Sequence, residues 1–291
     1  MEYGLLVKNV FLWLDKDGEE VRNILMKTLR KDDIHVSLIK SEIEWRTYKD
    51  DKSFLLTDNE KYLDLAISNK MAAAFYWNLE RGPCPATKSK WIIEGANEIN
   101  GMFLDRLFRR KHKIPWVIRE TKRCIIREIV LEDVPLLYNI YEGEGITEFM
   151  EPLFENMEDE IAYTKAYIES MYEFYQYGMW IVEKKEGGEV IGRVGLEHRE
   201  GYEELELGYI IGREYERKGY GREACRAAIQ YAKEELECKA LHCFIMEENI
   251  PSIKLCESLG FHYLENVYIE QGKKKEKMKR FYLDICREEK E

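Results

Sequence analysis

The stretches ELGYII (206–211) and RKGYGREA (217–224) determine how the second half of this chain is expected to fold. The first is an apolar strand, and the second is a loop with alternate glycines that runs into a helix. Glycine tolerates positive φ and lets the backbone approach a ligand closely. The N–H groups at the start of the helix then form a site for a pyrophosphate, which the helix dipole favours. Positive charge is added by Arg217, Lys218 and Arg222.

The glycine loop differs from two common nucleotide-binding motifs. It lacks the third glycine of the dinucleotide fingerprint, and no Gly-Lys-Ser/Thr of a P-loop occurs. A second segment, EENIPSIKLCESLGF (247–261), follows later in the chain. Asn249 and Ser252 suit the start of a helix, and Gly260 suits its end.

Taken together, residues 123–285 resemble the GNAT family of N-acetyltransferases, and most closely the branch with the ribosomal-protein alanine acetyltransferases. Four features carry the resemblance: an Ile-Arg-Glu strand (126–128), the Glu-Leu-Gly-Tyr strand, the glycine loop, and the Asn-x-x-Ser…Leu-Gly-Phe segment. The resemblance implies an α/β fold with a mixed, mostly antiparallel central sheet flanked by helices, in which the fourth and fifth strands splay apart.

The resemblance also implies acetyl-CoA as the co-substrate. Backbone groups of Tyr209, Ile210 and Ile211 would bind the pantetheine arm, and Asn249 and Ser252 would lie near the thioester. The pyrophosphate would be held by Arg217, Lys218, Gly219, Tyr220, Gly221 and Arg222. The family usually has Gln or Arg three residues before the first glycine, where this chain has Glu216.

Transfer to an amine requires a group that takes a proton, because a protonated amine cannot attack a thioester. Glu206 is the first candidate base and Glu197 the second; for each, a carboxylate without a catalytic role is the alternative. Many family members carry a tyrosine acid where this chain has Cys256. A thiol could protonate the leaving group, but a buried inert cysteine is the favoured alternative, and the acid is then Ser252, water or absent.

The first half alternates strand-like and helix-like segments, which predicts a small parallel α/β, Rossmann-like domain over residues 1–115. The acetyltransferase domain is expected over 116–291. Residues 54–74 and Leu14-Asp15-Lys16-Asp17-Gly18 resemble haloacid dehalogenase-like proteins. That resemblance raises the alternative of a magnesium-dependent phosphatase, although a degenerate binding module is favoured.

Two helices are expected over 131–143 and 157–175. Aromatic and apolar side chains recur at helical spacing along the second, which predicts that they pack in the core: Tyr163, Tyr167, Met171, Phe174 and Tyr175.

Charge is unevenly distributed in this chain, whose net charge is −11. Residues 1–115 carry 20 basic and 18 acidic side chains, whereas residues 116–291 carry 25 and 38. An acidic half attracts amines and disfavours nucleic acid, and the alternative is that the charge only confers solubility. The expected acceptor is a small amine, an amino acid or a peptide N-terminus, and the non-enzyme alternative is an acyl-CoA sensor without turnover.

The seven cysteines and five histidines show no metal-ligand spacing, so no metal is expected. No apolar run is long enough for a membrane helix, and no secretion signal is evident. A cytoplasmic protein without a membrane partner is expected. The oligomeric state stays open, a homodimer included.

Overall fold

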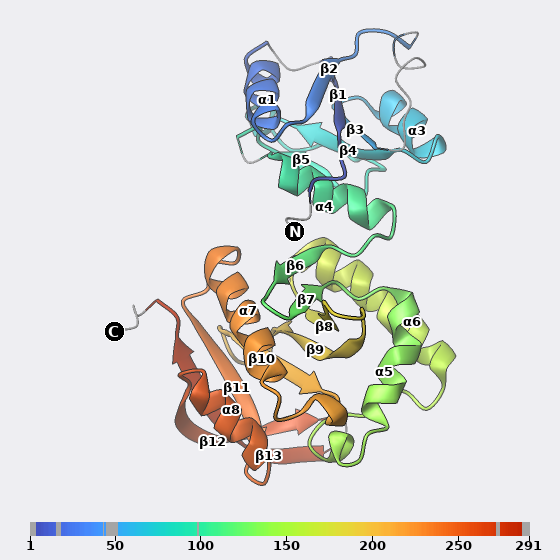
Figure 1. The fold of residues 1–291 in the computed structure, drawn as a ribbon. Helices are drawn as coiled ribbons and strands as arrows, with labels where there is room; N and C mark the ends of the chain where they lie inside the picture. The colour runs from blue at the N-terminus through green and yellow to red at the C-terminus, as the bar shows by residue number, and fades with distance from the viewer. Residues whose placement is uncertain are drawn as a thin grey trace. The chain divides into compact units, whose positions relative to one another are not determined.

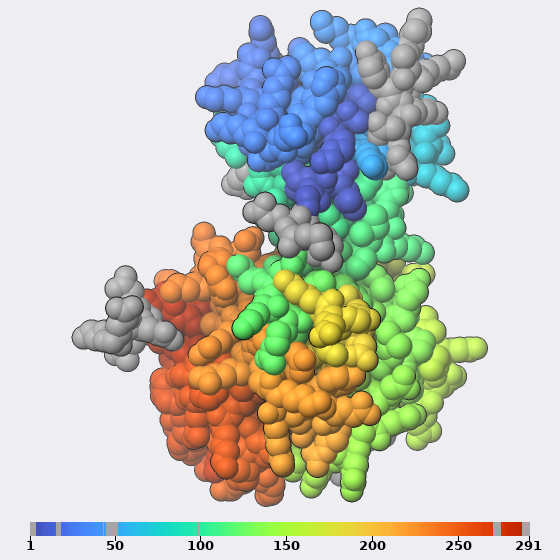
Figure 2. Space-filling view, viewed as in Figure 1, coloured from blue at the N-terminus to red at the C-terminus, as the bar shows by residue number. Residues whose placement is uncertain are grey.

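The computed structural model describes residues 4–15, 19–42, 44, 52–97, 99–271 and 274–286, with only the backbone of 270, 271 and 274. The chain divides into two compact units, Met1–Ile114 and Pro115–Glu291. Figure 2 shows both as tightly packed bodies, the first blue to green and the second green to red.

The first unit contains five parallel strands in the order β2-β1-β3-β4-β5. They are β1 (Asn9–Trp13), β2 (His35–Leu38), β3 (Ser53–Thr57), β4 (Ala72–Trp77) and β5 (Ile92–Glu94). Every residue of β3 and β4 is buried, as expected for central strands that are covered on both faces. The covering helices are α1 (Glu19–Lys31), α3 (Glu60–Ser68) and α4 (Gly101–Lys111) (Figure 1). This arrangement confirms the predicted parallel α/β fold.

The second unit is built on an eight-stranded sheet in the order β12-β13-β11-β10-β9-β8-β7-β6. Its strands are β6 (Val117–Glu120), β7 (Cys124–Arg127), β8 (Met179–Lys184), β9 (Val190–Glu197), β10 (Leu205–Ile211), β11 (Ala240–Met246), β12 (His262–Gln271) and β13 (Lys274–Asp284). Among the pairings described, only β10 with β11 is parallel. The mixed, mostly antiparallel sheet predicted from the sequence is therefore confirmed.

Four α-helices accompany this sheet: α5 (Val134–Tyr141), α6 (Met157–Tyr167), α7 (Tyr220–Glu234) and α8 (Ile250–Ser258). α5 packs on β9, whereas α7 packs on both β9 and β10 (Figure 1). Trp180, Tyr172 and Tyr231 are the largest fully buried side chains of the unit. The rings of Trp180 and Tyr231 meet edge to face at 5.0 Å, which ties β8 to α7.

Two glycines of β9 let the neighbouring strands β8 and β10 approach closely. A Cβ on Gly192 would lie 2.2 Å from the Ile210 carbonyl oxygen, and one on Gly195 would lie 2.1 Å from the Gly178 carbonyl oxygen. Neither backbone oxygen can yield like a flexible side chain. These positions therefore accept only glycine without a shift of the neighbouring strands.

The aromatic stripe predicted as core is wrong for three of its five members. Tyr163 is 52% exposed, Phe174 76% and Tyr175 50%. The predicted helix ends as an α-helix at Tyr167 and continues as a π-helix, Ile168–Tyr175. A π-turn breaks the 3.6-residue period, so Tyr172 becomes the buried residue instead. The short edge strand β6 was not predicted; it begins directly after the expected domain boundary between residues 115 and 116.

Candidate active site

Strands β10 and β11 diverge soon after they begin to pair. They pair only at Leu205 with Leu241 and at Glu206 with His242. β10 then continues to Ile211 and β11 to Met246 without further pairing to each other. The predicted binding residues Tyr209, Ile210 and Ile211 all lie on this diverging part of β10. Their edge faces an opening in which backbone groups are available to a ligand.

The glycine loop follows β10 and ends at the start of α7. Arg217 has φ +56° and Gly219, the N-cap of α7, has φ +82°. The first hydrogen bond within the helix runs from the Glu223 N–H to the Gly219 carbonyl at 3.1 Å. The N–H groups of residues 219–222 therefore precede the helical ladder, and such groups attract an anion. Gly221 fits closely, since its Cβ would lie 3.2 Å from Leu255 and 3.4 Å from Ile211.

Arg123, in the β6–β7 turn, holds the loop from the far end of the sheet. Its Nη1 donates to the Lys218 carbonyl at 2.8 Å, and its Nε donates to Glu223 Oε2 at 2.7 Å. Its guanidinium lies 4.3 Å from the centre of the Tyr220 ring. Burial alone would raise the pKa of Glu223, but hydrogen bonds from Thr121 and Arg123 outweigh it and lower that pKa. Sequence reasoning missed Arg123, because nothing local links it to residues about 100 positions away.

The departure at Glu216 has a structural compensation. Arg213 Nη1 lies 3.0 Å from Glu216 Oε2, so an arginine pairs with the carboxylate at the position where the family has Gln or Arg. The β8–β9 turn lies beside the same loop, with Lys184 Nζ 5.7 Å from the Tyr215 ring (Figure 2). The loop therefore keeps a net positive surrounding despite the extra acidic residue.

Asn249 and Ser252 form the N-terminal cap of α8. The Asn249 side chain accepts a hydrogen bond from the Ser252 N–H at 3.2 Å. Tyr209 reaches across from β10 and its hydroxyl donates to the Ser252 carbonyl at 3.0 Å. Burial raises the pKa of Tyr209 well above its ordinary value, so the phenol stays protonated. The structure thus brings Tyr209, Asn249 and Ser252 together.

Cys256 is fully buried in the core and is one of three thiols that meet beneath the opening. The other two are Cys225 and Cys243, and the Cys243 thiol donates a hydrogen bond to the Leu207 carbonyl at 3.4 Å. Burial raises the pKa of Cys243 well above the ordinary value of a thiol. This environment is typical of a packed, inert thiol.

Glu206 and Glu197 lie side by side where β10 and β11 begin to diverge. They are direct cross-strand partners of β9 and β10. Arg199 Nε donates to Glu206 Oε2 at 2.6 Å, and the Glu206 side chain is 14% exposed. Burial raises the pKa of Glu206, although Arg199 opposes the shift. A carboxyl with a raised pKa beside a second carboxylate can accept a proton from an amine.

Tyrosines cover the two glutamates on the helix side. The Tyr167 hydroxyl lies 3.5 Å from Glu197 Oε1 and accepts a hydrogen bond from the Met179 N–H at 2.6 Å. Tyr163 interacts electrostatically with Glu197 and with Arg193, which precedes Glu197 by four residues on β9. Sequence reasoning assigned these tyrosines to the core and did not single out Arg193. The alternation of β9 could have placed Arg193 and Glu197 on one face.

A surface pocket of about 410 Å³ adjoins the loop between α7 and β6. Its lining includes Gly219 and three arginines, Arg119, Arg222 and Arg226. Two of these are engaged elsewhere: Arg119 pairs with Glu234 at 2.7 Å, and Arg222 donates to the Ser258 carbonyl at 3.1 Å. The pocket adds basic character next to the anion-attracting helix end.

The first unit places Asp15 and Asp58 at the carboxyl ends of β1 and β3. The Asp15 N–H donates to Asp58 Oδ1 at 2.8 Å, and the Asn59 amide donates to Asp15 Oδ2 at 2.8 Å. Arg81 Nη1 lies 3.7 Å from Asp58 Oδ2. Asp17 and Gly18, the rest of the dehalogenase-like motif, lie outside the described residues. The resemblance to that class therefore stays a prediction.

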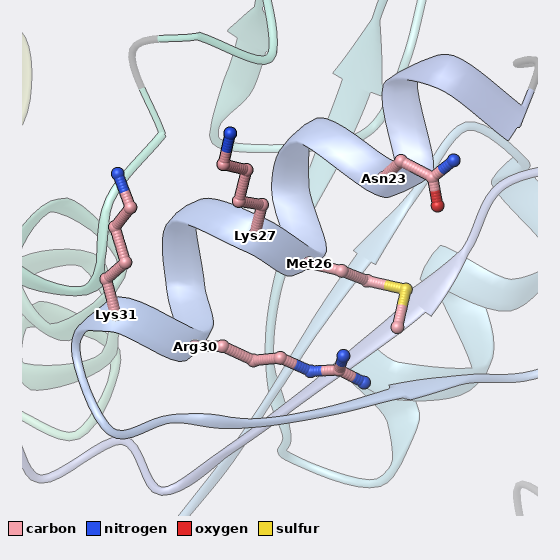
Figure 3. Close-up of a pocket in the computed structure, with 5 residues that line it drawn as sticks. All are labelled: Asn23, Met26, Lys27, Arg30 and Lys31. Carbon is pink, nitrogen blue, oxygen red and sulfur yellow. The ribbon is translucent and has the colours of Figure 1, made fainter.

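A shallow depression of about 430 Å³ lies along α1 of the first unit (Figure 3). One helix supplies all of its lining, which consists of Asn23, Met26, Lys27, Arg30 and Lys31. The described part of the chain contains no group of three or more His, Cys, Asp or Glu residues that could hold a metal ion. Within the same part, no helix has both the length and the apolar character needed to cross a membrane.

Comparisons with known proteins agree with this geometry. The acetyltransferase (GNAT) domain model matches residues 123–262. The uncharacterized protein YkkB of Bacillus subtilis (strain 168) is 32% identical over 95 residues, which cover 32% of this chain and 55% of YkkB. The chain thus spans about half the length of that relative. The uncharacterized N-acetyltransferase p20 of Bacillus licheniformis is 28% identical over 149 residues, 48% of this chain and 80% of p20.

Among solved structures, the ribosomal-protein-S5-alanine acetyltransferase from Vibrio fischeri matches with a TM-score of 0.50 and 16% identity. The match covers 57% of this chain and 95% of that structure. At this identity the likeness concerns the fold alone.

Proposed function

Because residues 123–262 form a GNAT acetyltransferase domain, we propose that this chain transfers an acetyl group from acetyl-CoA to an amine. One observation carries the proposal: β10 and β11 separate after Glu206 and His242, and the opening leads to the free N–H groups at the start of α7. An extended arm followed by a pyrophosphate fits this combination of an open strand edge and a helix N-terminus.

Donor binding is assigned to backbone groups along β10 and the loop. Tyr209, Ile210 and Ile211 would hold the pantetheine arm, and residues 217–222 would hold the pyrophosphate. Because the donors are mainly backbone N–H groups, the acidic Glu216 does not prevent binding. Arg123 supports the loop by fixing the Lys218 carbonyl and Glu223. Asn249 and Ser252 would lie near the thioester.

Glu206 is proposed to act as general base. It would take a proton from the ammonium form of the acceptor, after which the nitrogen lone pair attacks the thioester carbonyl. The new C–N bond forms and the C–S bond breaks, while the second proton on the attacking nitrogen passes through water to the leaving thiolate. Glu197, opposite Glu206, would bind the ammonium before transfer. The raised pKa of Glu206 suits this role, since a stronger base takes the proton more readily.

The Cys256 thiol is the weaker candidate for an acid. Its complete burial favours a packing role. The seven cysteines are all free thiols, which supports a reducing compartment such as the cytoplasm.

The proposal is tested by calorimetric titration with CoA and by thiol release from acetyl-CoA over a panel of amines, amino acids and short peptides. CoA should bind with micromolar affinity, and the Gly219→Val/Gly221→Leu variant should lose binding. A matched control is Gly4→Ala, because Gly4 has no positive φ and a Cβ there would meet nothing within 4 Å. Unchanged CoA binding in the loop variant would contradict the proposal.

A further inference from the structure

Arg193, on β9, is a part-buried cation that lacks a carboxylate partner. Its Nη1 lies 3.5 Å from the Tyr141 hydroxyl, a long hydrogen bond. Its Nε is buried and has no hydrogen-bond partner among the described residues. Other arginines of the unit are paired: Arg127 with Asp133 and Glu183, Arg199 with Glu206, and Arg280 with Glu265.

An unpaired guanidinium in such a place has no evident structural purpose. Removing a charge from water is costly unless an opposite charge or a full set of hydrogen bonds replaces the water. Long polar side chains in a core are nearly always paired, so each exception needs an explanation. A ligand that supplies the missing anion is the simplest one.

The surroundings of Arg193 point toward the catalytic glutamates. The hydroxyls of Tyr141, Tyr167 and Tyr172 interact electrostatically with its guanidinium. Arg193 and Glu197 lie on the same face of β9, four residues or about 13 Å apart along the strand. Tyr163, which is 52% exposed, interacts electrostatically with both of them. Arg193 therefore lies at one end of this face, and Glu197 lies at the other end beside Glu206.

We propose that this face of β9 binds the acceptor as a zwitterion, with its carboxylate on Arg193 and its amine at Glu197 and Glu206. The acceptor class is then an amine that carries a carboxylate, namely an amino acid or a short peptide. This inference rests on the acetyltransferase function proposed above. A guanidinium pairs with a carboxylate through two parallel hydrogen bonds, a geometry that a second ammonium cannot share. Polyamines are disfavoured, because their distal ammonium would meet Arg193.

The test compares acceptors that differ only in the carboxylate: lysine with cadaverine, 6-aminohexanoate with hexylamine, and dialanine with dialanine amide. Thiol release from acetyl-CoA gives kcat/KM for each. The carboxylate-bearing member of at least one pair should be preferred about 10- to 100-fold, the range for a hydrogen-bonded charge. Arg193→Met should abolish that preference, and Arg193→Lys should restore part of it. Arg280→Met, an arginine paired elsewhere in the same sheet, is the matched control and should keep it.

Calorimetric titration with CoA separates the two levels of the argument. If Arg193→Met binds CoA like the parent protein and loses only the carboxylate preference, the inference holds. It is overturned if the parent prefers the carboxylate-bearing member in none of the three pairs, or if it binds CoA without turning over any carboxylate-bearing acceptor. If the parent binds no CoA at all, the proposed acetyltransferase function itself fails. A melting temperature for Arg193→Met at or above the parent's shows that the variant is folded.

Discussion

Arg123→Ala should weaken CoA binding, because it removes the positive charge that neutralises the Glu223 carboxylate and leaves that carboxylate in place. Glu223 is held not only by the Arg123 side chain but also by the Thr121 hydroxyl and the Arg123 backbone N–H, each at 2.7 Å. The last two bonds do not need the arginine side chain. After substitution, the Glu223 charge therefore stays in the first turn of α7 without its counter-ion.

The size of the effect follows from Coulomb's law. Helix geometry puts a pyrophosphate at the N-terminus of α7 about 8 Å from Glu223. At an effective dielectric constant of about 40, between surface and bulk values, each phosphate charge is repelled by about 1 kcal/mol. Two charges give about 2 kcal/mol, or roughly a 30-fold weaker Kd. The loss of the bond to the Lys218 carbonyl should add to this by loosening the loop.

Isothermal titration with CoA at low and high salt measures this prediction. The double variant Arg123→Ala/Glu223→Gln is the control, because removal of the stranded charge should recover most of the lost affinity. High salt should also reduce the difference between Arg123→Ala and the parent. A single variant that binds CoA within twofold of the parent, or a double variant as weak as the single one, would refute the electrostatic reasoning.

Three further substitutions test the site and its support. Glu206→Gln should lower kcat by about 10²- to 10⁴-fold with CoA affinity unchanged, as expected for a general base, and a CoA-saturated rate assay checks this. The folded state holds the Glu206 proton more tightly than the unfolded chain, because the pKa of Glu206 is raised on folding. The parent should therefore lose stability as the pH rises from the ordinary carboxyl pKa through the raised one. Thermal melts of Glu206→Gln over the same pH range should lack that loss. Gly192→Ala should lower the melting temperature by several degrees, since its Cβ meets the Ile210 carbonyl oxygen, and calorimetry measures this. Cys256→Ala should lower the melting temperature but change kcat by less than about threefold; a much larger fall would identify the thiol as the acid.

The parts of the fold that depend on local pattern were predictable from the sequence. The apolar strand expected at 206–211 lies within β10, and α8 was placed within one residue by Asn249 and Gly260. The errors arise where local pattern conflicts with a longer-range effect. The π-helix at 168–175 shifts the buried face by a fraction of a turn, and no signal in the composition predicts it. β6 pairs at the sheet edge directly after the expected domain boundary between residues 115 and 116.

In the candidate site, too, the residues within short motifs were predicted and those brought in by long-range packing were not. The glycine loop, the diverging strand and the Asn249 cap are contiguous in sequence, so short motifs revealed them. Arg123 contacts the loop across about 100 residues, and the tyrosines that cover Glu197 come from another helix. Such contacts are set by the packing of the whole unit, which a single sequence does not display.

The two halves of the site rest on different physics, and this explains why the donor is easier to infer than the acceptor. On the donor side, the proposed ligands are backbone N–H groups whose position depends on a few glycines and a helix end, so Glu216 can replace the usual residue once Arg213 pairs with it. On the proposed acceptor side, the surface consists of side chains on β9, β10 and α6, each free to change while the fold persists. The match of residues 123–262 to the acetyltransferase domain model therefore constrains the donor side strongly and the acceptor side hardly at all. Arg193 is informative for this reason. Its buried Nε has no hydrogen-bond partner among the described residues, which costs free energy of folding, and it lies on the proposed acceptor side. Binding of the acceptor's carboxylate is the role that we propose for it.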